Sequence, residues 1–365
     1  MAYTTIDDPS IYFNTILWTG SGNSSARSFT GVGFQPDWVW YKCRSDTYNH
    51  NFVDVVRGTG LNSELCSNKN SAEGGGDAST HGYLSSFDSD GFSSANGSSN
   101  NLEFNQSGDT FVAWNWKAGG SASSNSDGTI TSSVSANTTA GFSIVSYTSN
   151  GSASQTVGHG LGAVPHMIIA KNRDSGGSSY NYWTVYHHSL ATANDKKLKL
   201  NETEAATSTN LWGDADPTTT KFYVHTTGDG STNVSTDKII AYCFTGKKGY
   251  SKFGRYIGNG SSDGPFVYTG FKPAWVMFKP AGESADWTIV DAKRNTFNVV
   301  KDKTLNANLN SAEHDGSMDT DFLSNGFKIR NGNTDNNSSN AAGIIYMAFA
   351  ESPFVNSSGV PTNAR

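Results

Sequence analysis

Two aspartates, Asp54 and Asp291, are the residues best placed to do chemistry. Each lies 18 residues after a proline, within similar apolar segments. A catalytic carboxylate works with a second group positioned beside it. A third, slightly longer version of the segment carries His187 at the matching position. Because a position shared by several copies is explained by the fold, we interpret these residues as parts of a turn or strand edge and predict no catalytic residue.

Metal and cofactor motifs are weak or missing in the sequence. The stretch from Asp88 to Gly91 begins like a calcium-binding EF-hand loop, but its twelfth position is Ser99 and not glutamate. Four histidines lie outside the spacing of helical or Cys/His metal sites: His159, His166, His187 and His188. A phosphate-binding loop, a dinucleotide fingerprint and a nucleophile elbow are also absent. We therefore expect neither a metal nor a cofactor.

Aromatic side chains in polar loops are the remaining candidates for binding. Tyr180, Tyr182 and Trp212 lie among Ser, Gly, Asn and Thr residues. Flat aromatic rings can stack on sugars in shallow polar sites, so these three residues form a candidate glycan-binding or partner-binding set. The alternative is that they cover the ends of an apolar core.

These residues are positioned by a unit that occurs three times. Its most recognisable part is a proline followed by an apolar run and a lysine, at 33–42, 162–171 and 270–279. Proline can start a strand but cannot supply a hydrogen bond inside a sheet, so the block predicts the entry to a buried strand. An aromatic residue precedes each proline by 18, 18 and 17 residues, and a closing apolar strand follows each. This indicates a triplicated unit of roughly 105 residues.

Composition agrees with a β-rich fold. The chain has 365 residues, 39 glycines, 12% aromatic and 16% charged residues, and it has no long helical pattern. We predict an all-β protein of three tandem antiparallel β-sandwich repeats, compatible with a lectin-like jelly roll. The expected parts are an N-terminal arm (1–15), repeat one (16–118), a Gly/Ser/Thr-rich linker (119–140), repeat two (141–247), repeat three (248–351) and a C-terminal tail (352–365).

Charge, cysteine content and hydropathy limit the partners and the cellular location to be expected. The net charge is −6 and basic residues do not cluster with aromatic ones, so nucleic acid is not an expected partner. Three scattered cysteines do not make a disulfide framework, and we expect Cys43 and Cys243 to be buried. The N-terminus lacks the pattern of a secretory signal and no apolar run is long enough to span a bilayer. We expect synthesis in a cytoplasm and no membrane insertion.

Several motifs together resemble a known family. They are the G-F-x-P-D/A-W-V-x-x-K block, the F-D-S-D-G-F hairpin, the junction G-Y-S-K-F-G-x-Y-x-G-N-G at 249–260, and the ending from Tyr346 to Arg365. Across the whole chain, the sequence resembles uncharacterised repeat proteins encoded among the virion structural genes of marine tailed bacteriophages. Members of that group are described as structural, tail-associated or fibre-associated proteins.

The resemblance implies a non-enzymatic virion protein of the tail or its appendages, in contact with other virion proteins through the arm and tail. A host-surface glycan is a further partner that it allows. Phage appendages are often trimeric, so a homo-oligomer is expected, although three repeats in one chain could also build quasi-threefold symmetry alone. The alternatives are a capsid decoration protein and, from another class, a glycan-binding module or polysaccharide depolymerase.

Overall fold

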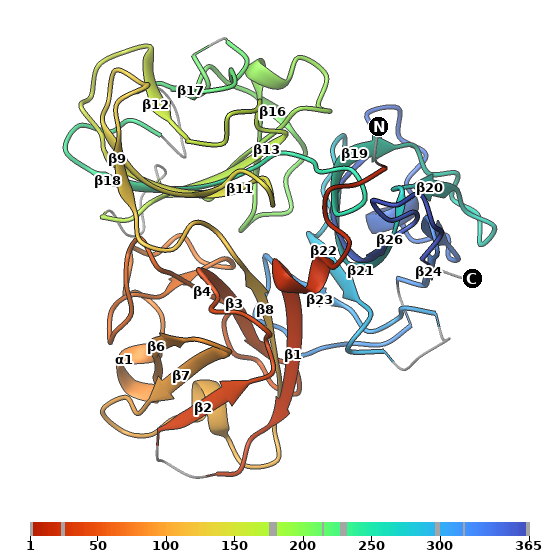
Figure 1. Ribbon diagram of the computed structural model, residues 1–365, viewed down its shortest axis with the longest axis horizontal. Coiled ribbons are helices and arrows are strands. Elements are labelled where there is room, and N and C mark those ends of the chain that lie inside the picture. Colours follow the sequence, from red (N-terminus) through yellow and green to blue (C-terminus); the bar gives the residue numbers. More distant parts are fainter. Residues whose placement is uncertain are drawn as a thin grey trace.

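The chain forms three lobes around a common centre (Figure 1). The computed structural model describes residues 3–22, 26–174, 181–213, 215–226, 232–295, 300–316 and 318–362. The expectation of an all-β fold built from antiparallel sheets is confirmed. We call the lobes the first unit (13–116), the second unit (123–244) and the third unit (251–353). Each contains one large and one small sheet.

The first unit packs a five-stranded sheet against a three-stranded sheet. The large sheet has the order β1-β8-β3-β4-β5, with β1 Phe13–Thr19, β3 Trp38–Cys43, β4 Asn51–Asp54, β5 Leu65–Cys66 and β8 Thr110–Trp116. The small sheet has the order β2-β7-β6, with β2 Arg27–Thr30, β6 Tyr83–Asp88 and β7 Gly91–Ala95. The short helices α1 Ala78–His81 and α2 Leu102–Asn105 lie in the connections. Phe29, Val39 and Phe92 belong to the core between the two sheets.

The third unit repeats this strand order. Its large sheet is β19-β26-β21-β22-β23, with β19 Ser251–Tyr256, β21 Phe271–Pro280, β22 Thr288–Asp291, β23 Leu305–Asn306 and β26 Ile344–Pro353. Its small sheet is β20-β25-β24, with β20 Phe266–Tyr268, β24 Thr320–Leu323 and β25 Gly326–Ile329. The helix α3 Thr334–Asn337 precedes the closing strand.

The second unit keeps the central order but has a wider large sheet. This sheet runs β16-β15-β14-β13-β18-β11-β10-β9, with β9 Ser123–Asn125, β10 Ser132–Asn137, β11 Phe142–Thr148, β13 Met167–Asn172, β14 Thr184–His187, β15 Lys196–Lys199, β16 Thr207–Ser208 and β18 Lys238–Phe244. Its small sheet pairs β12 Gln155–Gly158 with β17 Lys221–Val224.

The stretch 119–140 is not the linker that its composition predicts. It contains β9 and β10, and β10 pairs with β11 from Ser132–Tyr147 to Asn137–Phe142. The Ser-rich sequence still alternates buried and exposed positions at its start, as a strand near the edge of a sheet does. The strand therefore extends the second sheet.

Strand register is the same in the three large sheets. Trp38, Met167 and Trp275 pair on one side with Trp116, Phe244 and Phe349, and on the other side with Asp54, His187 and Asp291. This agreement lets each residue of one unit be matched with a residue of the other two.

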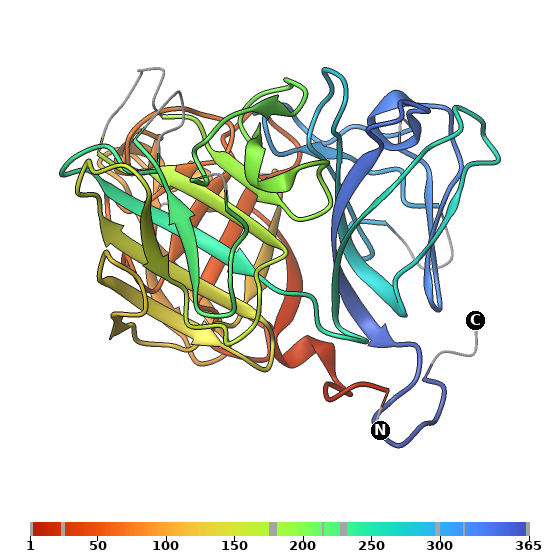
Figure 2. The ribbon, with the colours of Figure 1, turned by 90° about the horizontal axis from the view of Figure 1, so that it is seen from above.

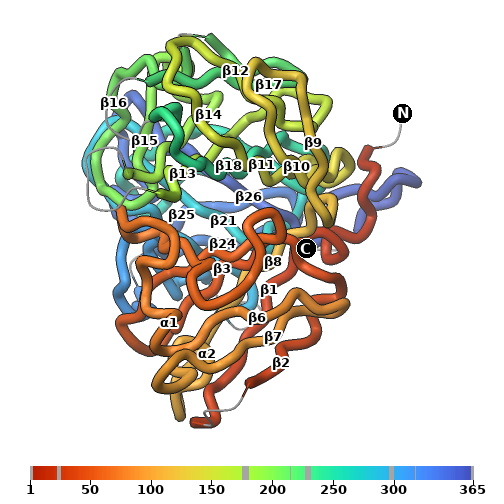
Figure 3. Tube along the Cα trace, turned by 90° about the vertical axis from the view of Figure 1, so that its left-hand side faces the viewer, coloured from red at the N-terminus to blue at the C-terminus, as the bar shows by residue number. Residues whose placement is uncertain are grey.

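The three large sheets share one core. Trp38 stacks on Trp116 of its own unit with centroids 4.3 Å apart, and on Tyr242 of the second unit at 4.6 Å. Phe349 of the third unit lies 5.6 Å from Trp116 and 6.2 Å from Phe244. Figure 3 shows strands β21 and β26 of the third unit behind and between the other two units.

Separate tandem sandwiches would have buried only one face of each large sheet. Here the large sheet lies between its small sheet and the other two units, so all six residues of β3 and all six of β13 are buried. Continuous apolar runs, rather than alternating ones, are typical of strands buried on both faces. The apolar run after each proline is explained by this arrangement.

Both termini lie along the third unit, on the same side of the molecule (Figure 2). In the N-terminal arm, the Tyr3 hydroxyl donates to the Gly270 carbonyl at 3.0 Å and the Thr4 hydroxyl to the Lys248 carbonyl at 2.7 Å. Asp7 accepts hydrogen bonds from the main chain and side chain of Ser357 at 2.6 and 2.5 Å. The arm is thus held by its own chain.

Candidate functional site

The predicted carboxylate Asp54 is buried where the first unit meets the second. It accepts hydrogen bonds from the main-chain N–H groups of Val56 and Arg57 at 3.0 and 2.9 Å, and Arg57 Nε lies 2.5 Å away. The hydroxyl of Tyr242, from the second unit, donates to Asp54 Oδ2 at 2.8 Å. Asp54 therefore fixes a turn and joins two units, in agreement with its structural interpretation.

A second carboxylate extends this junction. Glu73 of the first unit pairs with Arg57 at 2.8 Å and with Arg173 of the second unit at 2.6 Å. Its main-chain N–H also donates to the Arg173 carbonyl at 2.9 Å. The buried guanidinium of Arg57 is thus neutralised on two sides, as a buried charge requires.

The junction between the third and first units repeats the pattern. Asp291 accepts from Arg294 Nε at 2.5 Å and from the Trp114 indole N–H, of the first unit, at 3.1 Å. Glu313 pairs with Arg294 at 2.9 Å and with Arg44 of the first unit at 2.7 Å. Although burial alone would raise the pKa of Glu313, hydrogen bonds from Arg44 and the charge of Arg294 hold it below its ordinary value.

At the junction between the second and third units the equivalent position carries a histidine instead of the buried aspartate. His187 takes the place of the aspartate, and its Nε2 lies 3.3 Å from the Tyr346 carbonyl oxygen. The residue that matches Trp114 and Tyr242 is Met347, which has no donor to offer a carboxylate. Substitution of the aspartate by histidine is explained by this loss of a donor.

Two further histidines lie beside His187. The His166 and His188 rings stack with centroids 4.4 Å apart, and His188 Nε2 lies 3.0 Å from the carbonyl oxygen of Phe253 in the third unit. Burial, and then the neighbouring His188, lower the pKa of His187 to about 3 and that of His166 to about 4. Within the described ranges, no three His, Cys, Asp or Glu side chains are grouped to hold a metal ion.

Two further carboxylic acids are buried in the first unit. Burial raises the pKa of Glu64 to about 7 and that of Glu103 to about 8. Glu103 lies on α2 and accepts a hydrogen bond from the Asn51 side chain at 3.0 Å. Their protonation is coupled to the stability of the first unit.

The aromatic residues predicted to bind are not brought together at a described surface. Tyr180 lies outside the described residues. Tyr182 is half-buried, with the Lys199 ammonium 3.8 Å from its ring centroid. Trp212 is only 1% exposed and donates to the Lys196 carbonyl at 3.0 Å, so its faces are covered by protein. For Trp212 the core-covering alternative holds.

Cys43 and Cys243 are buried as expected, and Cys66, whose burial was not predicted from the sequence, is also a free thiol in the interior. Among the described residues, no helix combines the length and apolar character that a membrane crossing demands.

The outer surface of the third unit carries a feature that the sequence patterns did not predict. On its small sheet, Phe266 is 45%, Tyr268 47% and Leu323 37% exposed. Tyr268 and Leu323 both pair with Gly326, so they form one row across the sheet, while Phe266 lies two residues along on the same face. We call these three residues the outer aromatic face.

The matching positions in the first unit are polar. Register aligns Phe266, Tyr268 and Leu323 with Ser28, Thr30 and Asp88. A residue-by-residue comparison of the short strands of the copies could have revealed this difference, because it is a change from polar to apolar side chains at fixed positions. The outer aromatic face also borders the arm, since the Tyr3 and Tyr268 hydroxyls are 2.9 Å apart.

Comparison with known proteins gives one family. Neither curated proteins nor solved structures gave a match. A family model described as a domain of unknown function, DUF7483, matches residues 8–353, which include all three units. The chain therefore belongs to the DUF7483 family.

Proposed function

We propose that this protein is a non-enzymatic structural component of a tailed bacteriophage virion, in the tail or one of its appendages. The observation that carries the proposal is the outer aromatic face, an apolar surface on the third unit, next to both chain termini. Exposed apolar groups that cluster on one face are typical of protein interaction sites. The resemblance to virion structural proteins supplies the location.

The use of charged residues also supports a structural role. The buried carboxylates Asp54 and Asp291 each bind an arginine three residues along and a donor from another unit. Catalytic carboxylates need access to a substrate, whereas these side chains are 0% exposed. They stabilise a rigid body, which is what a particle component requires.

In this proposal the third unit docks on a neighbouring virion protein through Phe266, Tyr268 and Leu323, with the arm and tail along the rim. The first and second units then point away from the docking site and are free to face the host.

The test begins with the particle. Mass spectrometry of purified virions should detect the chain in a fixed copy number, and imaging should place its three-lobed density on the tail. Density on the head shell would replace the tail assignment by a capsid decoration role, and absence from the particle would overturn the proposal.

Docking is tested by giving the third unit the polar residues of the first. The double variant Phe266→Ser, Tyr268→Thr should fold, because Ser28 and Thr30 occupy the same strand positions. We expect its incorporation into virions to fall at least tenfold, whereas Val164→Ser, at a 40% exposed valine on the second unit, should incorporate normally. Equal incorporation of both variants would exclude this face as the docking site.

A further inference from the structure

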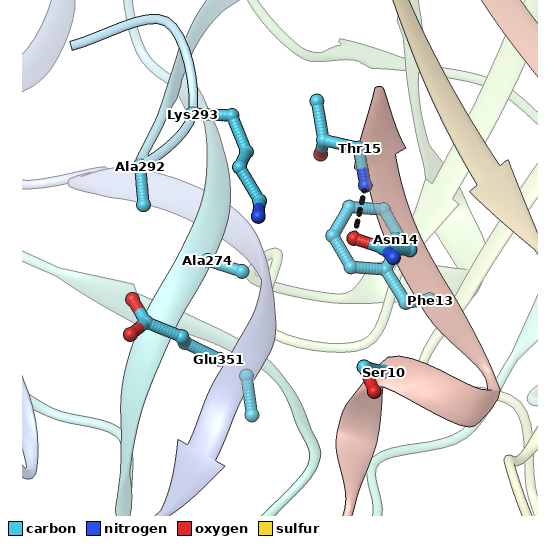
Figure 4. A pocket seen from close by; sticks show the side chains of 9 residues that line it. Ser10, Phe13, Asn14, Thr15, Ala274, Ala292, Lys293 and Glu351 are labelled. Carbon is cyan, nitrogen blue, oxygen red and sulfur yellow. Dashed lines mark hydrogen bonds between the residues drawn. The ribbon is translucent and has the colours of Figure 1, made fainter. Parts of the chain in front are cut away.

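A cavity of about 270 Å³ lies where the third unit meets the first. Figure 4 shows Phe13, Asn14 and Thr15 of β1 along one side, with Lys293 and Glu351 of the third unit on the other. Ala274, Ala292 and Ala350 also line it. The cavity is partly open, so a small molecule can enter from solvent.

The three junctions between units have equivalent positions, and the cavity exists because the side chains at this junction are small. At the junction of the second and third units, the residues that match Ala274 and Ala292 are His166 and His188, and the residue that matches Thr15 is Phe253. There the histidines stack on each other and His166 lies 6.3 Å from the Phe253 ring.

At the junction of the first and second units the matching residues are Asp37, Val55 and Ile144, which are also larger. Three small residues thus coincide at a single junction. Packing defects of this kind destabilise a core unless something occupies them.

One buried polar group of the cavity, the Thr15 hydroxyl, is left available for a ligand. Thr15 is only 5% exposed, yet its hydroxyl has no hydrogen-bond partner among the described residues. A buried hydroxyl without a partner destabilises the folded chain, because it has given up its hydrogen bonds to water. A ligand that exchanges a hydrogen bond with Thr15 recovers this loss.

Charge at the cavity favours an anion. Glu351 is paired with Lys272 at 2.9 Å, which leaves its charge compensated. Lys293 is exposed and makes no ion pair within the described part of the chain. The cavity therefore presents one uncompensated ammonium group beside the Thr15 hydroxyl and a small apolar wall, while the Asn14 amide is held by the Val32 carbonyl and the Thr15 N–H.

We propose that this cavity binds a sugar that carries a carboxylate, of monosaccharide size. Lys293 binds the carboxylate, the Thr15 hydroxyl exchanges a hydrogen bond with a ring hydroxyl, and the alanines with Phe13 contact the apolar face of the ring. Cavities of several hundred Å³ hold small organic ligands, and this one lies at the lower end of that range. The inference concerns binding and does not depend on a position in a virion.

The test uses D-glucuronate and D-galacturonate as probes with the full chain, in calorimetric titration or ligand-observed NMR. D-glucose is the neutral control. We expect at least one acid to bind, and glucose to bind at least tenfold more weakly because it lacks the charge-assisted contact. A glucuronate-terminated tetrasaccharide, compared with the free acid, shows whether the site takes a free sugar or a chain end.

The variants introduce residues that occur at equivalent positions of the other units, so that a loss of binding does not reflect misfolding. Lys293→Ser introduces the second unit's Ser189, and Ala292→Val introduces the first unit's Val55, so both residues are compatible with the fold. Both changes should weaken binding of the acid at least tenfold, while Lys221→Ser on β17 leaves it unchanged. Absence of binding by both acids, equal binding of glucose, or unaltered affinity of Lys293→Ser in a folded variant would overturn the proposal.

Discussion

Removal of the Tyr242 hydroxyl tests whether the junctions hold the three units together. This hydroxyl donates to Asp54 Oδ2 across the first and second units, at 2.8 Å. A hydrogen bond to a charged group contributes about 1.5–3 kcal/mol. Tyr242→Phe retains the ring that stacks on Trp38, so the free energy of unfolding should fall by about 2 kcal/mol.

Asp54→Asn should lower the free energy of unfolding by more, because among the described residues it leaves the buried Arg57 with Glu73 as its remaining ion-pair partner. Removing one partner of a buried ion pair costs about 3–5 kcal/mol. The double variant Tyr242→Phe, Asp54→Asn should be destabilised by about 1–2 kcal/mol less than the sum of the two single variants, since in Asp54→Asn the Tyr242 hydroxyl has already lost its charged acceptor.

The assay is urea unfolding followed by tryptophan fluorescence and circular dichroism, with Tyr223→Phe as control. Tyr223 is half-buried on β17, and its change should stay within about 0.5 kcal/mol. Coincident transitions are expected because the units share a core. If Tyr242→Phe behaves like Tyr223→Phe, or if the two junction changes are additive, the proposed coupling is wrong.

Burial and the shared core give three further predictions. The pKa of His187 is lowered by burial to about 3, so between about pH 3 and 6.5 the unfolded chain binds more protons and stability should fall on acidification. His187→Gln should therefore reduce the dependence of the urea midpoint on pH over that range. An unchanged pH dependence would contradict this. The pKa of Glu103 is raised by burial to about 8, so the folded state holds the extra proton above the unfolded pKa and stability should fall as the pH rises toward 8. The stability of Glu103→Gln relative to the parent protein should therefore be higher at pH 8.5 than at pH 5. A difference that does not depend on pH would refute the assignment. A fragment of residues 16–118 should fail to form a stable monomer, because Trp38 and Trp116 would lose their partners from other units; a native-like circular dichroism spectrum with cooperative unfolding would show that the first unit has a sufficient core of its own.

Much of the fold can be predicted from the spacing of the copies. The apolar run after each proline determines which strand is central, and β3 and β13 begin two residues after Pro36 and Pro165, as predicted. For the third copy the predicted strand start is wrong: β21 begins at Phe271 and includes Pro273, at a position where its register with β26 shifts. The packing of the large sheets on one another is harder to foresee. A run such as β13, buried throughout, indicates cover on both faces but does not say what supplies it.

The candidate sites are harder to predict because their parts are distant in sequence. The structural interpretation of Asp54 agrees with its contacts, yet nothing local indicates that its partner is Tyr242 of another unit. The polar neighbours of Trp212 make it a binding candidate, but its indole is buried against β15. Polar neighbours in a sequence do not establish exposure, since a loop can fold back over the core.

An internal threefold arrangement has a consequence that a trimer of identical chains does not. In a symmetric trimer every interface is the same, so a cavity or an apolar face would occur three times. Here the three junctions differ. At two of them a buried aspartate accepts a hydrogen bond from an aromatic side chain of another unit and a glutamate pairs with an arginine of another unit, whereas at the third His187 takes the place of the aspartate. The cavity beside Lys293 likewise occurs at one junction, and the outer aromatic face on one unit, because the residues at equivalent positions differ. Covalent linkage of the three units lets the shared core remain alike while each surface acquires its own partner, and the positions at which the copies disagree are therefore the ones to mutate first.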